Sequence, residues 1–206
     1  MATSAHEAAA RPIGQPLRIR RERFWNLPNT ITVVRTGAVP VLLMLPLFPT
    51  RSGSQAIAWV FIMAALSDVL DGWLARRGQQ ETKIGKLLDP LADKLIVATA
   101  LTVLLAMGRI PLWATWMVVV IVGRELAVTG LRGIASADGH VMGASSMGKA
   151  KTLIQNFAIG ALLFHYTTLG LPAHTVGMAS LCVATVLTLA SGYAYFAEYF
   201  RGSETG

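Results

Sequence analysis

Six long hydrophobic segments, separated by short stretches rich in glycine, proline and charged residues, run through most of the sequence. They cover approximately residues 29–48, 56–76, 87–107, 112–134, 152–169 and 175–196. A helix needs about 20 apolar residues to cross a bilayer, so six spans leave room only for short loops in a chain of 206 residues. The unbroken apolar runs lack the alternation of membrane β-strands. The sequence therefore predicts an all-α integral membrane protein with six transmembrane helices.

The basic residues indicate how these helices are oriented. Arginines and lysines cluster before the first segment, between the second and third, between the fourth and fifth, and after the sixth. The opposite loops contain only Arg51 and Arg109, and His165 and His174 also fall toward that opposite side. Lysine and arginine accumulate on the cytoplasmic side of membrane proteins. We therefore expect both termini to face the cytoplasm. We assign the net charge of +7 to membrane orientation and phosphorylated ligands, with no nucleic-acid partner.

The chain divides into three unequal parts. Residues 1–27 form a basic cytoplasmic tail with an expected interfacial amphipathic helix, in which Trp25 lies in the headgroup layer and the arginines meet anionic lipid. Residues 28–200 form the six-helix domain, and residues 201–206 a short cytoplasmic tail. The N-terminus lacks the apolar stretch of a secretory signal. We expect the inner (plasma) membrane of a cell; the alanine- and arginine-rich start leaves the mitochondrial inner membrane as the alternative.

Four aspartates stand out in a sequence that is otherwise poor in acids. Asp68 and Asp71 are three residues apart in the second segment, and Asp89 and Asp93 are four apart in the third, where Pro90 suits the first helical turn. On a helix, both spacings put the two carboxylates on one face. Four carboxylates cannot share a site near lipid without compensating charge, and oxygen ligands favour Mg²⁺ or Mn²⁺. We predict a divalent-metal site at the cytoplasmic ends of these helices. A solvated acidic face is the alternative for either pair taken alone.

The aspartates belong to a longer pattern with fixed spacing, Asp68-x2-Asp71-Gly72-x2-Ala75-Arg76-x8-Gly85-x3-Asp89-x3-Asp93. This eight-position pattern resembles, without departure, the signature of the CDP-alcohol phosphatidyltransferases. The resemblance implies six transmembrane helices, a homodimer and a two-metal site, open to the cytoplasm, that displaces CMP from a CDP-linked substrate. By position it implies metal ligands at Asp68, Asp71, Asp89 and Asp93, a general base at Asp93, and contacts to the cytidine diphosphate from Gly72, Arg76 and Gly85. A carboxylate beside the metals suits removal of the acceptor's hydroxyl proton.

A group of basic residues on the same expected side of the membrane points to the second substrate. It comprises Arg124, Arg132, Lys149 and Lys151. A basic pocket beside an acidic metal site indicates an acceptor that carries a phosphate group. Anchoring at the membrane face is the alternative for either lysine, and a structural ion pair with Glu125 is the alternative for Arg124.

Several short motifs are similar to the phosphatidylglycerophosphate-forming branch of the family. They are residues 28–35 with Pro40, Arg124-Glu125, Lys149-x-Lys151-Thr152 and Gln155. In this interpretation Asn29 and Thr32 contact the CDP-lipid, while capping of the first helix is the alternative for Asn29. Arg35 lies about two turns inside its segment, where we expect a contact to substrate phosphate or to the aspartates. His140 lies in a cytoplasmic loop, where solvation is the expected state and an approach to phosphate the alternative.

Together these features predict an enzyme that transfers the phosphatidyl group of CDP-diacylglycerol to the 1-hydroxyl of glycerol 3-phosphate and releases CMP. Two alternatives keep this chemistry and change the acceptor, either to inositol phosphate or to phosphatidylglycerol as in cardiolipin synthesis. A divalent-cation carrier that uses the aspartates and a structural membrane adaptor are the alternatives outside this chemistry. Membrane lipids and a second copy of the chain are the other expected partners.

Overall fold

The computed structural model describes residues 27–75, 83–137, 143, 146–167 and 170–203; for 27–29, 31, 68–75, 83–89, 137, 202 and 203 it describes the backbone alone. Six α-helices account for most of these ranges. They are α1 (Leu27–Leu43), α2 (Arg51–Ala75), α3 (Lys83–Ala106), α4 (Thr115–Ala137), α5 (Ser146–Phe164) and α6 (Ala173–Ser203). Short 3₁₀ turns, η1 (Leu45–Leu47) and η2 (Leu112–Ala114), precede α2 and α4. The described ranges contain no β-strand, which confirms the all-α prediction.

Each predicted hydrophobic segment corresponds to one helix, but several helix ends differ from the prediction. α2 begins at Arg51 and α5 at Ser146, five and six residues before the predicted segments. Hydropathy marks residues that suit lipid, whereas a helix continues for as long as its backbone hydrogen bonds do. α5 ends at Phe164, five residues before the predicted end. The next residue, His165, has a φ of 59°, which a right-handed helix does not accommodate.

Two local predictions about helix starts are wrong. Pro90 is the eighth residue of α3 and lies outside its first turn, because the helix begins at Lys83 in polar sequence. Proline has no N–H to donate, so the carbonyl of Lys86 lacks the usual helical hydrogen bond. Asn29 is the third residue of α1 and therefore does not occupy an N-cap position. Pro28 precedes it within the first turn, where its fixed φ suits a helix.

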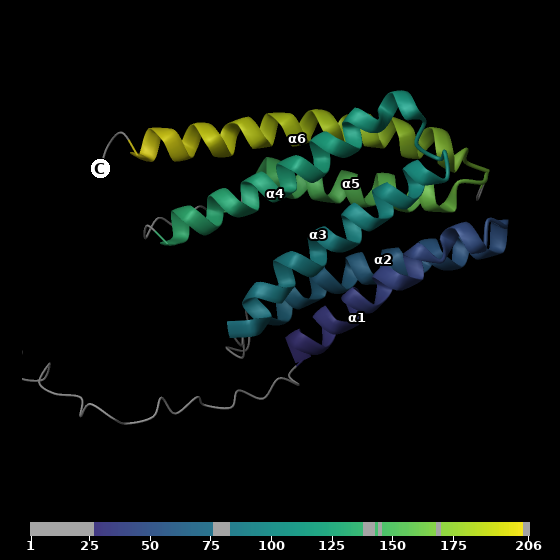
Figure 1. The fold of residues 1–206 in the computed structure, drawn as a ribbon, viewed down its shortest axis with the longest axis horizontal. Helices are drawn as coiled ribbons and strands as arrows, with labels where there is room; N and C mark the ends of the chain where they lie inside the picture. The colour runs from purple at the N-terminus through teal and green to yellow at the C-terminus, as the bar shows by residue number, and fades with distance from the viewer. Residues whose placement is uncertain (1–26, 76–82, 138–142, 144–145, 168–169, 204–206) are drawn as a thin grey trace, which may run out of the picture.

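The helices run back and forth along the long axis of the molecule and form two groups (Figure 1). α1 contacts both α2 and α3 in one group, α6 contacts both α4 and α5 in the other, and α5 also contacts α2 and α3. The connections from α1 to α2, from α3 to α4 and from α5 to α6 gather at the right-hand end in Figure 1. α1 begins and α6 ends toward the opposite end. The helices therefore alternate in direction, as six consecutive membrane spans require.

The buried interior consists mainly of apolar side chains. Leu42 of α1, Phe61 of α2 and Leu104 of α3 are almost fully buried. A Cβ atom at Gly177 of α6 would lie only 3.0 Å from the backbone nitrogen of Leu162 in α5, so a glycine is needed for this close approach. In lipid, where the hydrophobic effect does not drive helices together, such close backbone contacts supply packing energy. The interior is thus built in the way that membrane helices associate.

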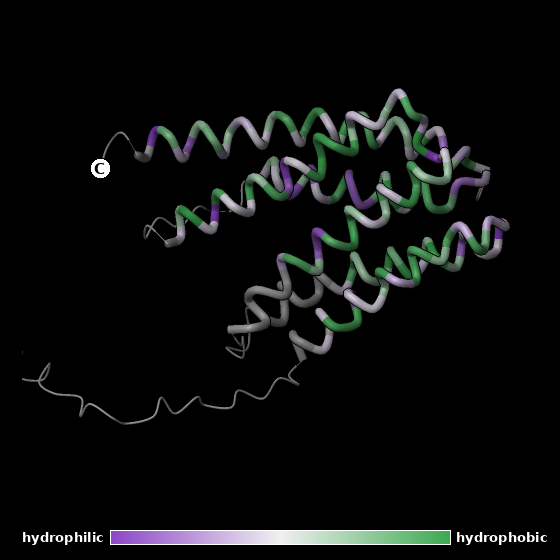
Figure 2. The backbone as a smooth tube through the Cα atoms, viewed as in Figure 1, coloured by the Kyte–Doolittle hydropathy of each residue, from purple (hydrophilic) through white to green (hydrophobic). Residues whose placement is uncertain are grey.

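The outer surface is apolar as well. Leu47, Leu153 and Val186 are among many exposed large hydrophobic side chains, and hydrophobic colouring covers much of the helices in Figure 2. Soluble proteins rarely expose this much apolar surface. Within the described residues, two helical stretches, Leu112–Ser136 and Ala173–Arg201, are long and apolar enough to cross a membrane. These observations indicate a membrane protein. Six spans and the cytoplasmic termini stay predictions, and the interfacial helix falls in residues 1–26, outside the described part of the chain.

Candidate active site

The aspartate pairs lie on consecutive helices toward the same end of the bundle, at the left in Figure 1. Asp68, Asp71 and Gly72 belong to the last third of α2, and Gly85, Asp89 and Asp93 to the first half of α3. Of the four aspartates, only Asp93 has a described side chain, and Arg76 lies outside the described residues. The described side chains include no group of three possible metal ligands. The predicted metal ligands and cytidine diphosphate contacts in this region therefore stay predictions.

Asp93 occupies a partly open position on α3. Its side chain is 32% exposed, and the Nζ atom of Lys94 donates a hydrogen bond of 3.4 Å to its Oδ2 atom. Within the described side chains Lys94 is the one cation in contact with this accessible carboxylate, which leaves lone pairs for another group. This arrangement suits a proton acceptor.

Glu125 of α4 gathers basic side chains from α3, α4 and α5. Lys151 donates a hydrogen bond to its Oε1 atom, and Nη1 of Arg124 lies 3.3 Å from the same oxygen. Nζ of Lys94 lies 3.8 Å from Oε2, and because Lys94 also contacts Asp93, it links the two carboxylates. We call Asp93, Lys94, Arg124, Glu125 and Lys151 the charged cluster. Lys151 is 1% exposed, so its ammonium group is held between helices.

A second set of contacts holds Arg124 against α6. Its Nη2 atom donates to Ser191 Oγ at 3.0 Å, and its guanidinium carbon lies 5.4 Å from the centre of the Tyr195 ring. Gly192 leaves room for this side chain, because a Cβ there would lie 3.1 Å from Arg124 Cγ. Within the described residues, Arg124 Nε has no hydrogen-bond partner. The guanidinium group thus keeps a donor that a ligand can use.

The four cations predicted to bind the acceptor separate into two pairs. Arg124 and Lys151 lie together in the charged cluster, whereas Arg132 and Lys149 are exposed. The ion pair between Arg124 and Glu125, which the sequence left as an alternative, is present. It does not exclude phosphate binding, because three cations face two carboxylates in the cluster and leave a positive balance.

Buried polar side chains of α1 and α5 continue the polar interior. Thr32, Arg35 and Gln155 are each 2% exposed, and Gln155 Oε1 has no hydrogen-bond partner in the described ranges. Polar groups buried in an apolar bundle are costly unless they are paired or bind a ligand. Because Thr32 and Arg35 are buried, they lie on the inward face of α1. The side chain of Asn29 and the whole of His140 lie outside the described residues.

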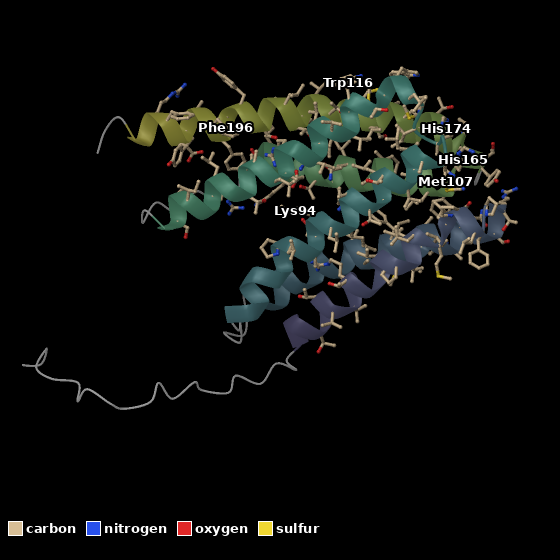
Figure 3. The ribbon with its side chains drawn as sticks, viewed as in Figure 1. Lys94, Met107, Trp116, His165, His174 and Phe196 are labelled. Carbon is tan, nitrogen blue, oxygen red and sulfur yellow. The ribbon has the colours of Figure 1, made fainter. Side chains whose placement is uncertain are left out.

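A different buried arginine lies at the opposite end of the bundle. Arg109 donates to the Leu163 carbonyl at 2.7 Å and to Ser54 Oγ at 2.6 Å, and its own carbonyl lies 2.8 Å from Nε2 of His174. Figure 3 shows His165 and His174 at this end, far from Lys94 along the long axis. Their position agrees with the expectation that these histidines lie toward the side opposite the aspartate pairs.

Comparison with known proteins decides which family has this arrangement. Residues 25–190 match the family model described as CDP-alcohol phosphatidyltransferase. The matched range is most of the chain and contains both aspartate pairs and the charged cluster. The chain belongs to the CDP-alcohol phosphatidyltransferase family.

Several curated relatives are similar along most of their length, and those from the following three organisms are among the ones named CDP-diacylglycerol–glycerol-3-phosphate 3-phosphatidyltransferase. The one from Bacillus subtilis (strain 168) is 38% identical over 194 residues, covering 88% of this chain and 99% of the relative. The one from Pseudomonas fluorescens is 40% identical over 177 residues, covering 82% and 88%. The one from Rickettsia bellii (strain RML369-C) is 33% identical over 175 residues, covering 83% and 93%.

Membership of the CDP-alcohol phosphatidyltransferases confirms the resemblance that the aspartate pattern indicated. It makes the protein a transferase of phospholipid biosynthesis. The comparisons therefore support an enzyme and neither of the two other classes considered from the sequence, a cation carrier and a structural adaptor.

Sequence reasoning missed part of the site of this CDP-alcohol phosphatidyltransferase. It gave Lys94 no role and treated Glu125 only as a neighbour of Arg124, although both belong to the charged cluster. The available signal was a charge in an otherwise apolar segment, which in membrane proteins usually has a function. That signal marks a residue, but its partner on another helix depends on how the helices pack.

Two hollows adjoin these helices. One, of about 150 Å³ between α3 and α4, is lined by Lys94 and Glu125 among apolar side chains. The other, of about 440 Å³ between α2, α5 and α6, has Asn156 as the one polar side chain among its lining residues. The walls of both hollows are almost entirely apolar, so both suit hydrocarbon better than a charged ligand.

Proposed function

We propose that this protein transfers the phosphatidyl group of CDP-diacylglycerol to the 1-hydroxyl of glycerol 3-phosphate, giving phosphatidylglycerophosphate and CMP. The names of relatives that are 33–40% identical support both substrates. The structural observation that carries the proposal is the charged cluster, because a continuous series of ion pairs joins the buried Lys151 to Asp93. Groups suited to phosphate binding and to proton transfer are thus neighbours.

In this proposal Arg124 and Lys151 bind the phosphate of glycerol 3-phosphate. A phosphate dianion can accept hydrogen bonds from the guanidinium group and from the ammonium group together. Arg132 and Lys149 are exposed on α4 and α5, where their charges attract the phosphate from water. With its phosphate held, the acceptor presents its terminal hydroxyl toward α3.

Asp93 acts as the general base. Its carboxylate accepts the proton of the 1-hydroxyl as that oxygen attacks the lipid-side phosphorus of CDP-diacylglycerol. A phosphorus–oxygen bond to glycerol 3-phosphate forms, the bond from phosphorus to the CMP oxygen breaks, and CMP leaves with the electron pair. The oxygen-only donor set of Asp68, Asp71, Asp89 and Asp93 fits two Mg²⁺ or Mn²⁺ ions. These carboxylates would hold the ions, whose positive charge would offset the negative charge of the pyrophosphate and of the departing CMP.

The CDP-lipid lies along α1, α2 and α3 in the same proposal. Its cytidine diphosphate contacts Asn29, Thr32, Gly72, Arg76 and Gly85; the motif spacing and the burial of Thr32 support this assignment. Its acyl chains stay in the bilayer, along apolar surface such as the groove between α2, α5 and α6. The enzyme works as a homodimer in the inner (plasma) membrane, with the site facing the cytoplasm.

A panel of acceptors tests the proposed reaction. Purified protein receives CDP-diacylglycerol and Mg²⁺ with glycerol 3-phosphate, inositol phosphate or phosphatidylglycerol, and CMP and the lipid product are measured. We expect CMP release with glycerol 3-phosphate and a product with the mass of phosphatidylglycerophosphate. Turnover with only inositol phosphate or phosphatidylglycerol would overturn the choice of acceptor while leaving the family chemistry in place.

Removal of metal tests the role of the aspartates. A chelator is expected to lower CMP release at least about 100-fold, and added Mg²⁺ or Mn²⁺ to restore it, because the pyrophosphate charge is otherwise uncompensated. Direct binding of Mn²⁺, followed by electron paramagnetic resonance, is expected to weaken in the Asp68→Asn variant. Full activity in excess chelator would contradict the metal assignment.

A further inference from the structure

Glu125 contacts three basic side chains at once. Lys151 and Arg124 share its Oε1 atom, and Lys94 approaches its Oε2 atom at 3.8 Å. The carboxylate is 14% exposed and Lys151 is 1% exposed, so these charges lie largely out of water. In such surroundings, loss of one member leaves the others uncompensated, which costs far more than a surface ion pair contributes.

The contacts of Glu125 reach both parts of the proposed reaction. Arg124 and Lys151 are the cations assigned to the acceptor phosphate, and Lys94 is hydrogen-bonded to Asp93, the assigned base. Glu125 and Asp93 carry two negative charges against three cations, so the charged cluster keeps one positive charge for an anion. A single side chain therefore contacts both groups assigned to the phosphate and is joined to Asp93 through Lys94.

We infer that Glu125 is a positioning residue for the acceptor phosphate: it holds Lys151 and Arg124 at a fixed spacing and, through Lys94, ties them to Asp93. This inference rests on the proposed function and goes beyond it, because Glu125 itself touches no reacting atom. Two buried atoms, Arg124 Nε and Gln155 Oε1, have no hydrogen-bond partner in the described ranges and so keep hydrogen-bonding capacity that a ligand can use. Gln155 lies one turn beyond Lys151 on α5.

The Glu125→Gln variant tests the inference. Glutamine keeps the shape of the side chain and one accepting oxygen but loses the negative charge that orders the cations. We expect the KM for glycerol 3-phosphate to rise about tenfold or more while the KM for CDP-diacylglycerol changes less than about twofold. Glu198→Gln removes the same charge from an exposed position on α6 and is expected to leave both KM values unchanged. Equal rises in both KM values for Glu125→Gln would overturn the inference.

A charge exchange separates positioning from mere structural support. The double variant Glu125→Lys with Lys151→Glu keeps an ion pair between α4 and α5, so it is expected to recover much of any loss in thermal stability. It puts a carboxylate where the phosphate needs a cation, so the KM for glycerol 3-phosphate is expected to stay high. Recovery of the wild-type KM in this variant would overturn two assignments, because Lys151 would not be needed at the phosphate and Glu125 would only support the fold.

A milder variant covers the case in which Glu125→Gln does not fold. Glu125→Asp keeps the negative charge but shortens the side chain by one methylene group, so the carboxylate lies farther from Lys151. We expect the KM for glycerol 3-phosphate to rise about threefold. A wild-type acceptor KM in Glu125→Asp would overturn the inference. The proposed function fails separately, when the wild-type enzyme does not use glycerol 3-phosphate. The inference alone fails when the wild type does use it and Glu125 variants keep its KM.

Discussion

Buried basic groups lie toward both ends of this helix bundle, and their partners differ in kind. At one end, Arg109 donates to the Leu163 carbonyl at 2.7 Å and to the Ser54 hydroxyl at 2.6 Å. Toward the other end, Arg124 and Lys151 share the carboxylate of Glu125, and Arg124 Nε has no partner in the described ranges. The first arrangement uses neutral groups that join helices, and the second is a cluster of charges with donors left over.

Burial alone does not distinguish these two arrangements. Arg109 is 4% exposed and Lys151 is 1% exposed, so both would be marked as costly buried charges. What differs is whether the surrounding groups complete the hydrogen bonding of the cation. A cation whose donors meet neutral acceptors stabilises the fold, whereas a cation in a cluster that retains net positive charge is prepared for an anionic ligand.

The largest expected effect is on turnover, and it comes from changing Asp93 in the charged cluster. Asp93→Asn removes the proton acceptor, so we expect turnover, measured as CMP release, to fall about 10³-fold or more. Binding of CDP-diacylglycerol, measured in the absence of acceptor, is expected to stay close to the wild-type value. A turnover within a few-fold of wild type would refute the assignment of Asp93 as the base.

Arg109→Met tests whether the opposite end is only structural. The change removes the two hydrogen bonds that Arg109 donates, so the Leu163 carbonyl and the Ser54 hydroxyl lose that donor. We expect this loss to lower the free energy of unfolding by about 2 kcal/mol. Thermal unfolding in detergent measures this loss. Both KM values are expected to remain unchanged in the folded fraction. A raised KM for glycerol 3-phosphate with unchanged thermal stability would show that Arg109 affects acceptor binding and is not only structural.

Lys151→Met tests the buried cation at the charged end. We expect the KM for glycerol 3-phosphate to rise about 30-fold, equivalent to about 2 kcal/mol of acceptor binding, with little change in the KM for CDP-diacylglycerol. Acceptor binding weakens for two reasons: the phosphate loses a charged hydrogen-bond donor, and the Glu125 carboxylate loses its ion pair with Lys151. Steady-state kinetics with each substrate varied in turn measure it. Equal changes in both KM values would show that Lys151 does not select the acceptor.

Lys149→Met is the smallest expected effect and the matched control for Lys151. The two lysines are two residues apart on α5, but Lys149 is exposed. An exposed charge interacts through water and is screened by salt, so we expect the acceptor KM to rise only about threefold and the effect to shrink at high ionic strength. Kinetics at two salt concentrations check this prediction. An effect as large as that of Lys151→Met would show that burial does not rank these cations.

The helices were predictable and their ends less so. The length of each apolar run is enough to indicate a helix, because only hydrogen-bonded helices or closed barrels suit lipid. α3 begins at Lys83 and α5 at Ser146, both before their apolar runs, because a helix can continue into polar sequence without changing its hydrogen bonding. The placement of Pro90 in a first turn failed for this reason.

The candidate site was predictable where its residues are local in sequence. The spacing from Asp89 to Asp93 and the motif from Asp68 to Gly85 lead to the family, which the match over residues 25–190 confirms. Of the four basic residues predicted to act together, Arg124 and Lys151 meet at Glu125, whereas Lys94 was not predicted to take part. Its ammonium group matters only because α3 and α4 pack so that it comes between Asp93 and Glu125.

The sequence by itself determined that the chain is helical, that its surroundings are apolar and that carboxylates pair on two successive helices. Those properties depend on composition and on spacings of three or four residues, which one helix expresses alone. Only the tertiary structure decided that Glu125 meets Lys151, 26 residues away, and that Arg109 meets Ser54 and Leu163 instead of a carboxylate. Contacts between helices depend on how each helix is rotated against its neighbours, and no local periodicity encodes that rotation.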